Sequence, residues 1–153
     1  MPPEGKERAM KDQNKKEILC FESSGKTYAA EFENIVEICF DTRLHSIPCQ
    51  PSYFCGVYHY KGMVVPVVQL EEEKIPESRS PVLLILRSGV YQFGIALLKE
   101  PYIQAVDEAE RTADAARRLS ASRPREKAIY THKDKIILLL DMEKTAENLV
   151  ACP

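Results

Sequence analysis

Three histidines and five cysteines are the residues of this chain best suited to nucleophilic or metal chemistry. A nucleophilic Cys–His pair needs a base beside the thiol, a third group that orients the base, and an oxyanion hole. His59 follows Cys55 by four positions. Residues at that spacing share a strand face but lie about 13 Å apart. The other candidates, which have no closer spacing, are His45, His132, Cys20, Cys39, Cys49 and Cys152. We therefore expect no enzyme activity.

The cysteine spacing is not typical of a metal site either. Zinc ligands usually come in closely spaced pairs, whereas the nearest two cysteines, Cys49 and Cys55, are six positions apart. In a reducing compartment such thiols serve as small apolar side chains. The sequence therefore predicts reduced cysteines, no metal and no cofactor.

Charge and hydropathy argue against two classes of partner. The 153 residues carry a formal net charge of -2 at pH 7, and no basic stripe interleaves with aromatic residues, so we expect no nucleic acid partner. No apolar run approaches the roughly 18 residues that a membrane span requires. The first residues are polar, unlike the apolar core of a signal peptide. We expect a cytoplasmic protein without direct membrane insertion.

Glycine-centred turns predict a mostly β fold. Gly25 and Gly89 each follow a serine between two apolar segments, the arrangement typical of a β-hairpin. These two hairpins lie 64 positions apart and resemble each other loosely, which is expected either of two similar small barrels or of a chance similarity between hairpins. The strands expected around these turns and around a third, polar turn span residues 18–22, 27–32, 82–86, 91–98, 128–131 and 136–140.

Helix is expected in two places only. Residues 108–119 are rich in alanine, glutamate and arginine, which favours a helix by propensity. Residues 142–150 are expected to form a C-terminal helix with Asp141 as its N-cap. Residues 1–16 are rich in proline, lysine and glutamate, so we expect a disordered N-terminal lead.

The segment from Gly56 to Leu70 combines a turn with an unusual strand. Lys61 and Gly62 form the turn, and the strand after it is apolar on both faces. Side chains alternate across a strand, so Val64, Pro66, Val68 and Leu70 share one face and Met63, Val65 and Val67 the other. A half-solvated strand would show polar residues on one face. We therefore expect both faces to be covered, by a second layer of protein or by a partner.

The strand expected at residues 35–40 has an apolar face and a mixed face. Its expected core face carries Val36, Ile38 and Phe40, and its solvated face carries Ile35, Glu37 and Cys39. An apolar residue beside an acid on a solvated face is typical of an interface.

In this order the elements resemble the CheW-like family, adaptors that couple chemoreceptors to the histidine kinase CheA. Four features of the family match this chain: the opening hairpin at residues 21–30, the Val-x-Glu-Ile element at 35–38, a Pro-x-x-Pro loop with the signature that follows it at 48–70, and the late Leu-Asp element at 138–144. The family's signature reads Gly-Val-x-x-x-Arg-Gly-x-x-x-Pro-x-x-Asp-Leu. The resemblance covers about residues 17–148. Lys61, Gln69 and Leu98 stand where the family has arginine and two acids, which puts partner specificity in doubt.

The resemblance implies a domain over residues 17–150 made of two packed five-stranded SH3-like barrels. It also implies a non-catalytic scaffold. One surface would dock the regulatory domain of a CheA-type histidine kinase, the groove between barrels would take a chemoreceptor's cytoplasmic tip, and the protein would join receptor arrays. The alternative is an SH3-like interaction module in a non-chemotactic signalling complex.

Five residues are the candidate protein-binding site under this interpretation: Ile35, Glu37, Gly56, Lys61 and Gly62. Gly56 would let a partner backbone approach closely, and Lys61 lies at the tip of a turn. Each also has a purely structural interpretation, because Ile35 could cap a core, Gly56 could serve local geometry, and Lys61 could be a solvated turn residue.

Overall fold

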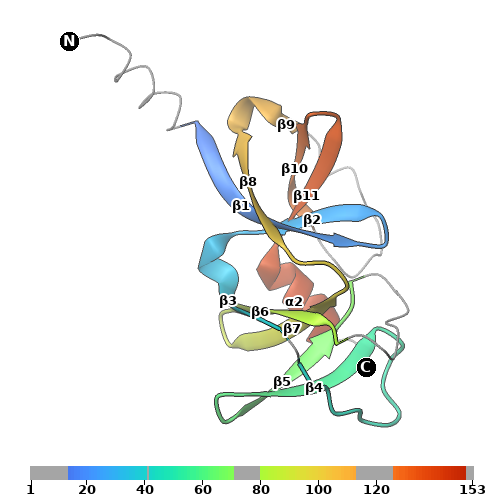
Figure 1. The fold of residues 1–153 in the computed structure, drawn as a ribbon. Helices are drawn as coiled ribbons and strands as arrows, with labels where there is room; N and C mark the ends of the chain where they lie inside the picture. Colours follow the sequence, from blue (N-terminus) through green and yellow to red (C-terminus); the bar gives the residue numbers. More distant parts are fainter. Residues whose placement is uncertain (1–13, 41, 71–79, 113–125, 151–153) are drawn as a thin grey trace, which may run out of the picture.

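The computed structural model describes residues 14–40, 42–70, 80–112 and 126–150, which form two β-sheets and one α-helix (Figure 1). Sheet A has the order β8-β1-β2-β11-β10-β9 and comprises β1 (Lys15–Ser23), β2 (Lys26–Ala30), β8 (Tyr102–Asp107), β9 (Arg111–Thr112), β10 (Glu126–His132) and β11 (Lys135–Leu140). Sheet B has the order β3-β6-β7-β5-β4 and comprises β3 (Ile35–Cys39), β4 (Phe54–Tyr60), β5 (Met63–Val68), β6 (Val82–Ser88) and β7 (Tyr91–Leu97). The remaining elements are the 3-10 helices η1 (Phe32–Asn34) and η2 (Glu108–Glu110) and the helix α2 (Met142–Val150).

Two-residue turns close the hairpins. Both central residues have positive φ in three of them, at Ser24–Gly25, Lys61–Gly62 and Lys133–Asp134, and Gly89 has positive φ in the β6–β7 turn. Such turns match the right-handed twist of paired strands. The three expected hairpins are therefore confirmed, and the expected five-stranded units are two sheets, with the short β9 adding a sixth strand to sheet A.

The two sheets repeat one pattern of pairing, residue for residue. The hairpins β1–β2 and β6–β7 occupy equivalent places, β11 adds parallel to β2, and β5 adds parallel to β7. Ala29 pairs with Leu139 in sheet A, and the equivalent Gly94 pairs with Val67 in sheet B. A bulge interrupts both outer strands at the same register, between Glu126 and Ala128 in β10 and between Phe54 and Gly56 in β4.

The two units are related by a circular permutation. Taken in chain order, the sheet A strands β1, β2, β8, β10 and β11 correspond to the sheet B strands β6, β7, β3, β4 and β5. Sheet B is continuous in sequence, whereas both ends of the described chain build sheet A. The loose echo around Gly25 and Gly89 thus reflects equivalent hairpins, in which the two glycines differ by one turn position because Gly89 corresponds to Ser24.

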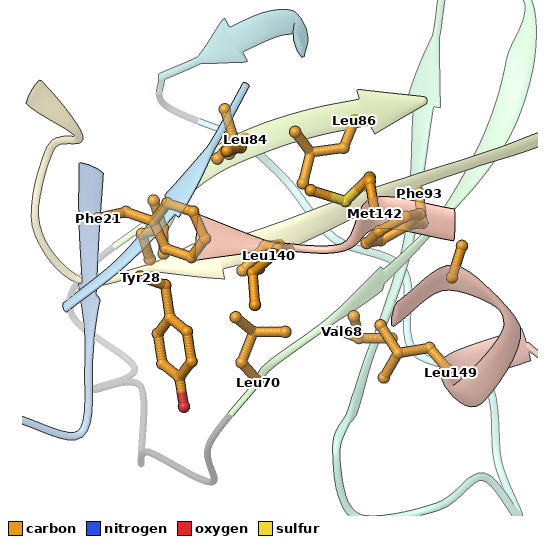
Figure 2. Close-up of a cluster of buried hydrophobic side chains, with 14 of the residues drawn as sticks. Phe21, Tyr28, Val68, Leu70, Leu84, Leu86, Phe93, Leu140, Met142 and Leu149 are labelled. Carbon is orange, nitrogen blue, oxygen red and sulfur yellow. The ribbon is translucent and has the colours of Figure 1, made fainter. Parts of the chain in front are cut away.

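Each sheet curls around a small core, and a larger core joins the sheets. The core of sheet A includes Ile18, Val106 and Tyr130, and that of sheet B includes Val67 and Leu83. The shared core takes residues from both sheets and from α2: Phe21, Tyr28, Val68, Leu70, Leu84, Leu86, Phe93, Leu140, Met142 and Leu149 (Figure 2). Figure 1 shows α2 between the two sheets. Strands β1, β2, β6, β7 and β11 are therefore buried on both faces.

The C-terminal helix begins and ends as its sequence predicts. Asp141 Oδ1 accepts a hydrogen bond from the backbone N–H of Lys144 at 3.1 Å, which satisfies an N–H of the first turn. At the other end, the buried Tyr53 hydroxyl donates to the Leu149 carbonyl at 3.1 Å. The helix is thereby tied to the segment that precedes β4.

The prediction of a helix at residues 108–119 is wrong for residues 108–112, which are the part that the structure describes. Asp107 and Glu110 form a capping box, but the turn ends as η2, and Arg111 is extended with φ −70° and ψ 123°. Arg111 and Thr112 then pair with β10 as β9, so sheet pairing overrides helix propensity. Residues 113–119 lie outside the described residues.

The N-terminal lead is shorter than expected, because Lys15 and Lys16 pair with Asp107 and Val106 of β8. Residues 1–13 lie outside the described residues.

Two expectations about strand faces need correction. In β5 the residues from Val65 onward are covered, but Met63 and Val64 are 54% and 59% exposed. In β3 a bulge between Ile35 and Glu37 shifts the alternation, so that Ile35 packs against the shared core together with Ile38. Phe40, expected in the core, is exposed.

Candidate protein-docking site

The tip of the β4–β5 hairpin presents a cation on a fixed turn. Lys61 has a φ of 46° and Gly62 a φ of 79°, and both residues are exposed. The Lys61 Nζ lies 5.3 Å from the centre of the Tyr60 ring. Hydrogen bonding to the Tyr60 side chain, together with the nearby Glu37 carboxylate, raises the pKa of Lys61. The ammonium group is therefore charged at physiological pH and points to solvent.

Beside this tip, β3 and β4 bring polar and aromatic side chains together. The Cys39 thiol donates to Glu37 Oε2 at 3.5 Å. Burial is the main cause that raises the pKa of Cys39, and the nearby Glu37 raises it further. Burial is also the main cause that raises the pKa of Tyr58, with further contributions from Cys39 and Glu37. We call Glu37, Cys39, Tyr58, Tyr60 and Lys61 the sheet B rim.

An exposed apolar pair adjoins the sheet B rim. Met63 lies opposite Tyr60 in the hairpin, and Val64 lies opposite His59. His59 in turn packs edge-to-face on His45, with 5.1 Å between ring centres. The hairpin tip thus combines one cation with apolar and aromatic surface, the composition expected of the centre of a protein interface.

The structure brings three of the five predicted site residues together. Glu37, Lys61 and Gly62 lie at or beside the sheet B rim. Ile35 instead packs partly buried against the shared core, the structural role that its sequence left open.

Gly56 serves the chain's own packing. It is buried with a φ of 142°, and a Cβ there would lie 2.7 Å from the His45 carbonyl oxygen. His45 and Val57 exchange backbone hydrogen bonds of 2.9 and 2.8 Å across this contact. The close approach expected of a partner backbone is thus made by the backbone at His45.

Five residues of this surface lay outside the site predicted from the sequence: Cys39, Tyr58, Tyr60, Met63 and Val64. A signal was present, because tyrosines two positions apart just before a turn must share one strand face. Met63 was assigned to a covered face, although it is the first residue after the turn and lies at the end of the sheet.

The structure gives no support to a Cys–His pair. The bulge in β4 places Cys55 against the small core of sheet B, together with Tyr58, and leaves His59 exposed on the opposite face. Burial raises the pKa of the Cys55 thiol to about 11, so it is protonated at neutral pH. Within the described residues no three His, Cys, Asp or Glu side chains are grouped to hold a metal, and no helix there could cross a membrane.

The equivalent rim of sheet A is covered. Its members, by strand register, are Tyr102, Gln104, Tyr130, His132 and Lys133. The η2 turn contributes Glu108, which accepts from the Tyr130 hydroxyl at 3.3 Å, and Glu110, whose Oε2 lies 2.7 Å from His132 Nδ1. In sheet B the segment before β4 takes the place of β9, because His45 pairs with Val57 as Thr112 pairs with Ile129, and Leu44 packs with Tyr58 against the small core. Tyr58 nevertheless stays half-buried, whereas its equivalent Tyr130 is buried.

Residues 17–149 match the family model described as CheW-like domain. The chain belongs to the CheW-like family. Among solved structures it is similar to the crystal structure of the scaffolding protein TtCheW from Thermoanaerobacter tengcongensis, with 18% sequence identity and a TM-score of 0.68 over 82% of this chain and 88% of that chain. At this identity the likeness establishes the fold. None of the curated proteins matches the sequence.

Membership places the protein in a family of chemotaxis scaffold adaptors, which are non-catalytic and act through protein interaction. The resemblance seen in the sequence is thereby confirmed for the family and for its mostly β fold with two sheets and a C-terminal helix.

Proposed function

We propose that this CheW-like protein is a cytoplasmic, non-catalytic scaffold that couples chemoreceptors to a CheA-type histidine kinase. The sheet B rim, with Gly62, Met63 and Val64, is the surface that docks the regulatory domain of the kinase. The observation that carries this assignment is the exposed apolar pair Met63 and Val64 beside the Lys61 cation.

Comparison with sheet A supports this choice of surface. Where sheet B exposes Met63 and Val64, sheet A exposes Lys135 and Ile136, so only one of the two positions is apolar in sheet A. A hollow of about 470 Å³ at that end of sheet A has four charged residues in its lining: Glu22, Lys26, Asp134 and Lys135. Glu22 pairs there with Lys99 at 3.1 Å and Lys135 at 3.7 Å. Charges paired within the chain suit a solvated end, whereas exposed apolar side chains gain from burial by a partner.

The seam between the sheets is the proposed contact for the chemoreceptor tip. Ile103 on β8 is 60% exposed and pairs with Leu19, which belongs to the shared core. An exposed apolar residue at the edge of that core is a suitable contact for an apolar helical tip.

The docking surface is tested by calorimetric titration of the kinase regulatory domain into the full chain. Lys61→Glu and Met63→Asp should each weaken binding at least tenfold, because one reverses a charge and the other places a charge in the buried centre of the interface. Both side chains are exposed, so the melting temperature should stay nearly unchanged.

Lys133→Glu is the matched control, because Lys133 holds the equivalent turn position in sheet A with a φ of 47°. It should bind like wild type. Equal binding by Lys61→Glu, Met63→Asp and wild type would show that the docking surface lies elsewhere.

An interaction module in a non-chemotactic complex is the second candidate, favoured by Lys61 in place of the family's arginine. A lysine cannot form the planar bidentate contacts of arginine. Gln69, by contrast, is 7% exposed, so its departure from the family pattern concerns packing. Retention of unrelated proteins, with no kinase or receptor, in a pull-down from native lysate would favour this alternative.

A further inference from the structure

The rim of sheet A, which η2 contacts, serves as an internal template for the more exposed rim of sheet B. In sheet A, η2 places two glutamates on Tyr130 and His132. Tyr130 is 1% exposed under this cover, whereas its equivalent Tyr58 is only half-buried. The register of the two sheets is the same at these positions, since Tyr130 pairs with Ile137 and Tyr58 with the equivalent Val65.

Three side chains of the sheet B rim, Tyr58, Tyr60 and Lys61, can donate hydrogen bonds to a carboxylate. Tyr58 and Tyr60 stand where sheet A has Tyr130 and His132, and each carries a phenolic hydroxyl. The Lys61 ammonium lies 5.3 Å from the Tyr60 ring centre, so it supplies a cation near the position of the His132 imidazole. Hydroxyl and ammonium groups donate to carboxylates, and charge-assisted bonds of this kind are the stronger ones.

From this equivalence we infer that the sheet B rim receives a short acidic turn of its partner, in the way that the sheet A rim receives η2. The inference rests on the proposed docking function and names the chemistry of the partner: a turn with two carboxylates, one contacting Tyr58 and the other Tyr60 and Lys61. Met63, beside Tyr60, provides the apolar contact that flanks the turn.

The negative charge of Glu37 disfavours binding of an acidic turn, so substitutions of Glu37 and of Lys61 should change the affinity in opposite directions. Its carboxylate lies on the same rim, accepts from the Cys39 thiol and has the same charge as the incoming group. Sheet A has the uncharged Tyr102 at the equivalent position. Removing the charge of Glu37 should therefore tighten binding, whereas removing that of Lys61 should weaken it.

The first test uses the chain's own acidic turn as the probe. A synthetic peptide of residues 105–112 is titrated into the isotope-labelled full chain and followed by NMR, beside a control peptide with Asp107, Glu108 and Glu110 changed to their amides. The acidic peptide should shift the amide signals of residues 58–62 in a saturable manner, and the control should not. Lys61→Gln should weaken this binding at least fivefold. Equal shifts from both peptides, or none at residues 58–62, would overturn the inference.

The second test uses the kinase regulatory domain. Glu37→Gln should bind at least threefold more tightly than wild type and Lys61→Gln about tenfold more weakly, with melting temperatures confirming that both variants fold. Weaker binding by Glu37→Gln would overturn the inference that the partner contributes an acidic turn, but it would not contradict the proposed docking function. If wild type does not bind the domain at all, the proposed function fails, and the peptide titration alone decides the inference.

Discussion

At residue 56 glycine is required by the backbone at His45. The φ of 142° is strained for any other residue, and an added Cβ would lie 2.7 Å from a carbonyl oxygen that cannot move without breaking the His45–Val57 hydrogen bonds. Gly56→Ala should therefore lower the free energy of unfolding by about 3 kcal/mol or more. Urea denaturation followed by circular dichroism measures this change.

Gly25→Ala is the matched control for that substitution. Gly25 has a φ of 77° and nothing within 4 Å of an added Cβ, so only the backbone strain remains. Its cost should be about 1–2 kcal/mol. Equal losses for the two variants would show that the contact with His45 is not what requires glycine at position 56.

At Glu110 the structure predicts a pH-dependent contribution to stability. The hydrogen bond from the Asp107 backbone N–H, followed by the contact with His132, lowers the pKa of Glu110 below its ordinary value of 4.5. A carboxylate with a lowered folded-state pKa stabilises the fold above its unfolded pKa, and this stabilisation is lost as the pH falls through the folded value.

Glu110→Gln, which keeps a side-chain acceptor for the Asp107 N–H, should therefore be less stable than wild type at pH 7, and this difference should shrink as the pH falls below 4.5. Urea midpoints across this range provide the measurement. A difference between the two proteins that does not change with pH would contradict the assignment.

The candidate site was predictable from the sequence where side chains point outward from a turn. Lys61 and Gly62 form a two-residue turn, and turn residues lie beyond the paired strands that could cover their side chains. The roles of Gly56 and Ile35 were not predictable, because they depend on the contact at His45 and on a bulge in β3. Both features arise from tertiary packing and leave no local pattern.

Strand β5 changes from exposed to buried along one face. Val64 and Val68 share that face, but Val64 is 59% exposed and Val68 is 4% exposed in the shared core. Val68→Asp should leave no folded protein, because an unpaired buried carboxylate costs several kcal/mol out of a typical stability of about 5–15 kcal/mol.

Val64→Asp should keep the wild-type melting temperature and weaken kinase binding. Thermal unfolding of both variants, with calorimetric titration of Val64→Asp, provides the comparison. A large loss of stability in Val64→Asp would mean that this end of β5 is covered within the chain itself.

The hairpins around Gly25 and Gly89 could be predicted because a serine and a glycine between apolar segments indicate a tight turn. Their register could not, because Gly25 is the second central residue of its turn and Gly89 the first. Residues 108–112 could not, because their helix propensity competes with strand pairing that only the folded sheet provides. Coverage of both faces was expected only for β5. It holds for the second half of β5, and also for β1, β2, β6, β7 and the part of β11 that follows the exposed Lys135 and Ile136.

The whole molecule is a permuted repeat joined by one core. Because residues of both sheets and α2 fill that core, the two sheets are held in a fixed relation (Figure 2). A scaffold needs this rigidity to present two surfaces to two partners. The equivalence of the sheets also shows where they diverge: η2 contacts the rim of sheet A and Tyr130 is buried there, whereas Tyr58 on the rim of sheet B is only half-buried.

The most direct test of the docking assignment is NMR mapping of the full chain bound to the kinase regulatory domain. Transfer of saturation from the unlabelled domain should reach the amides of residues 37–39 and 58–64, on β3 and the β4–β5 tip. The equivalent residues of sheet A, 102–104 and 130–136, should be unaffected. Saturation confined to sheet A or to α2, or a failure to form the complex, would contradict the account.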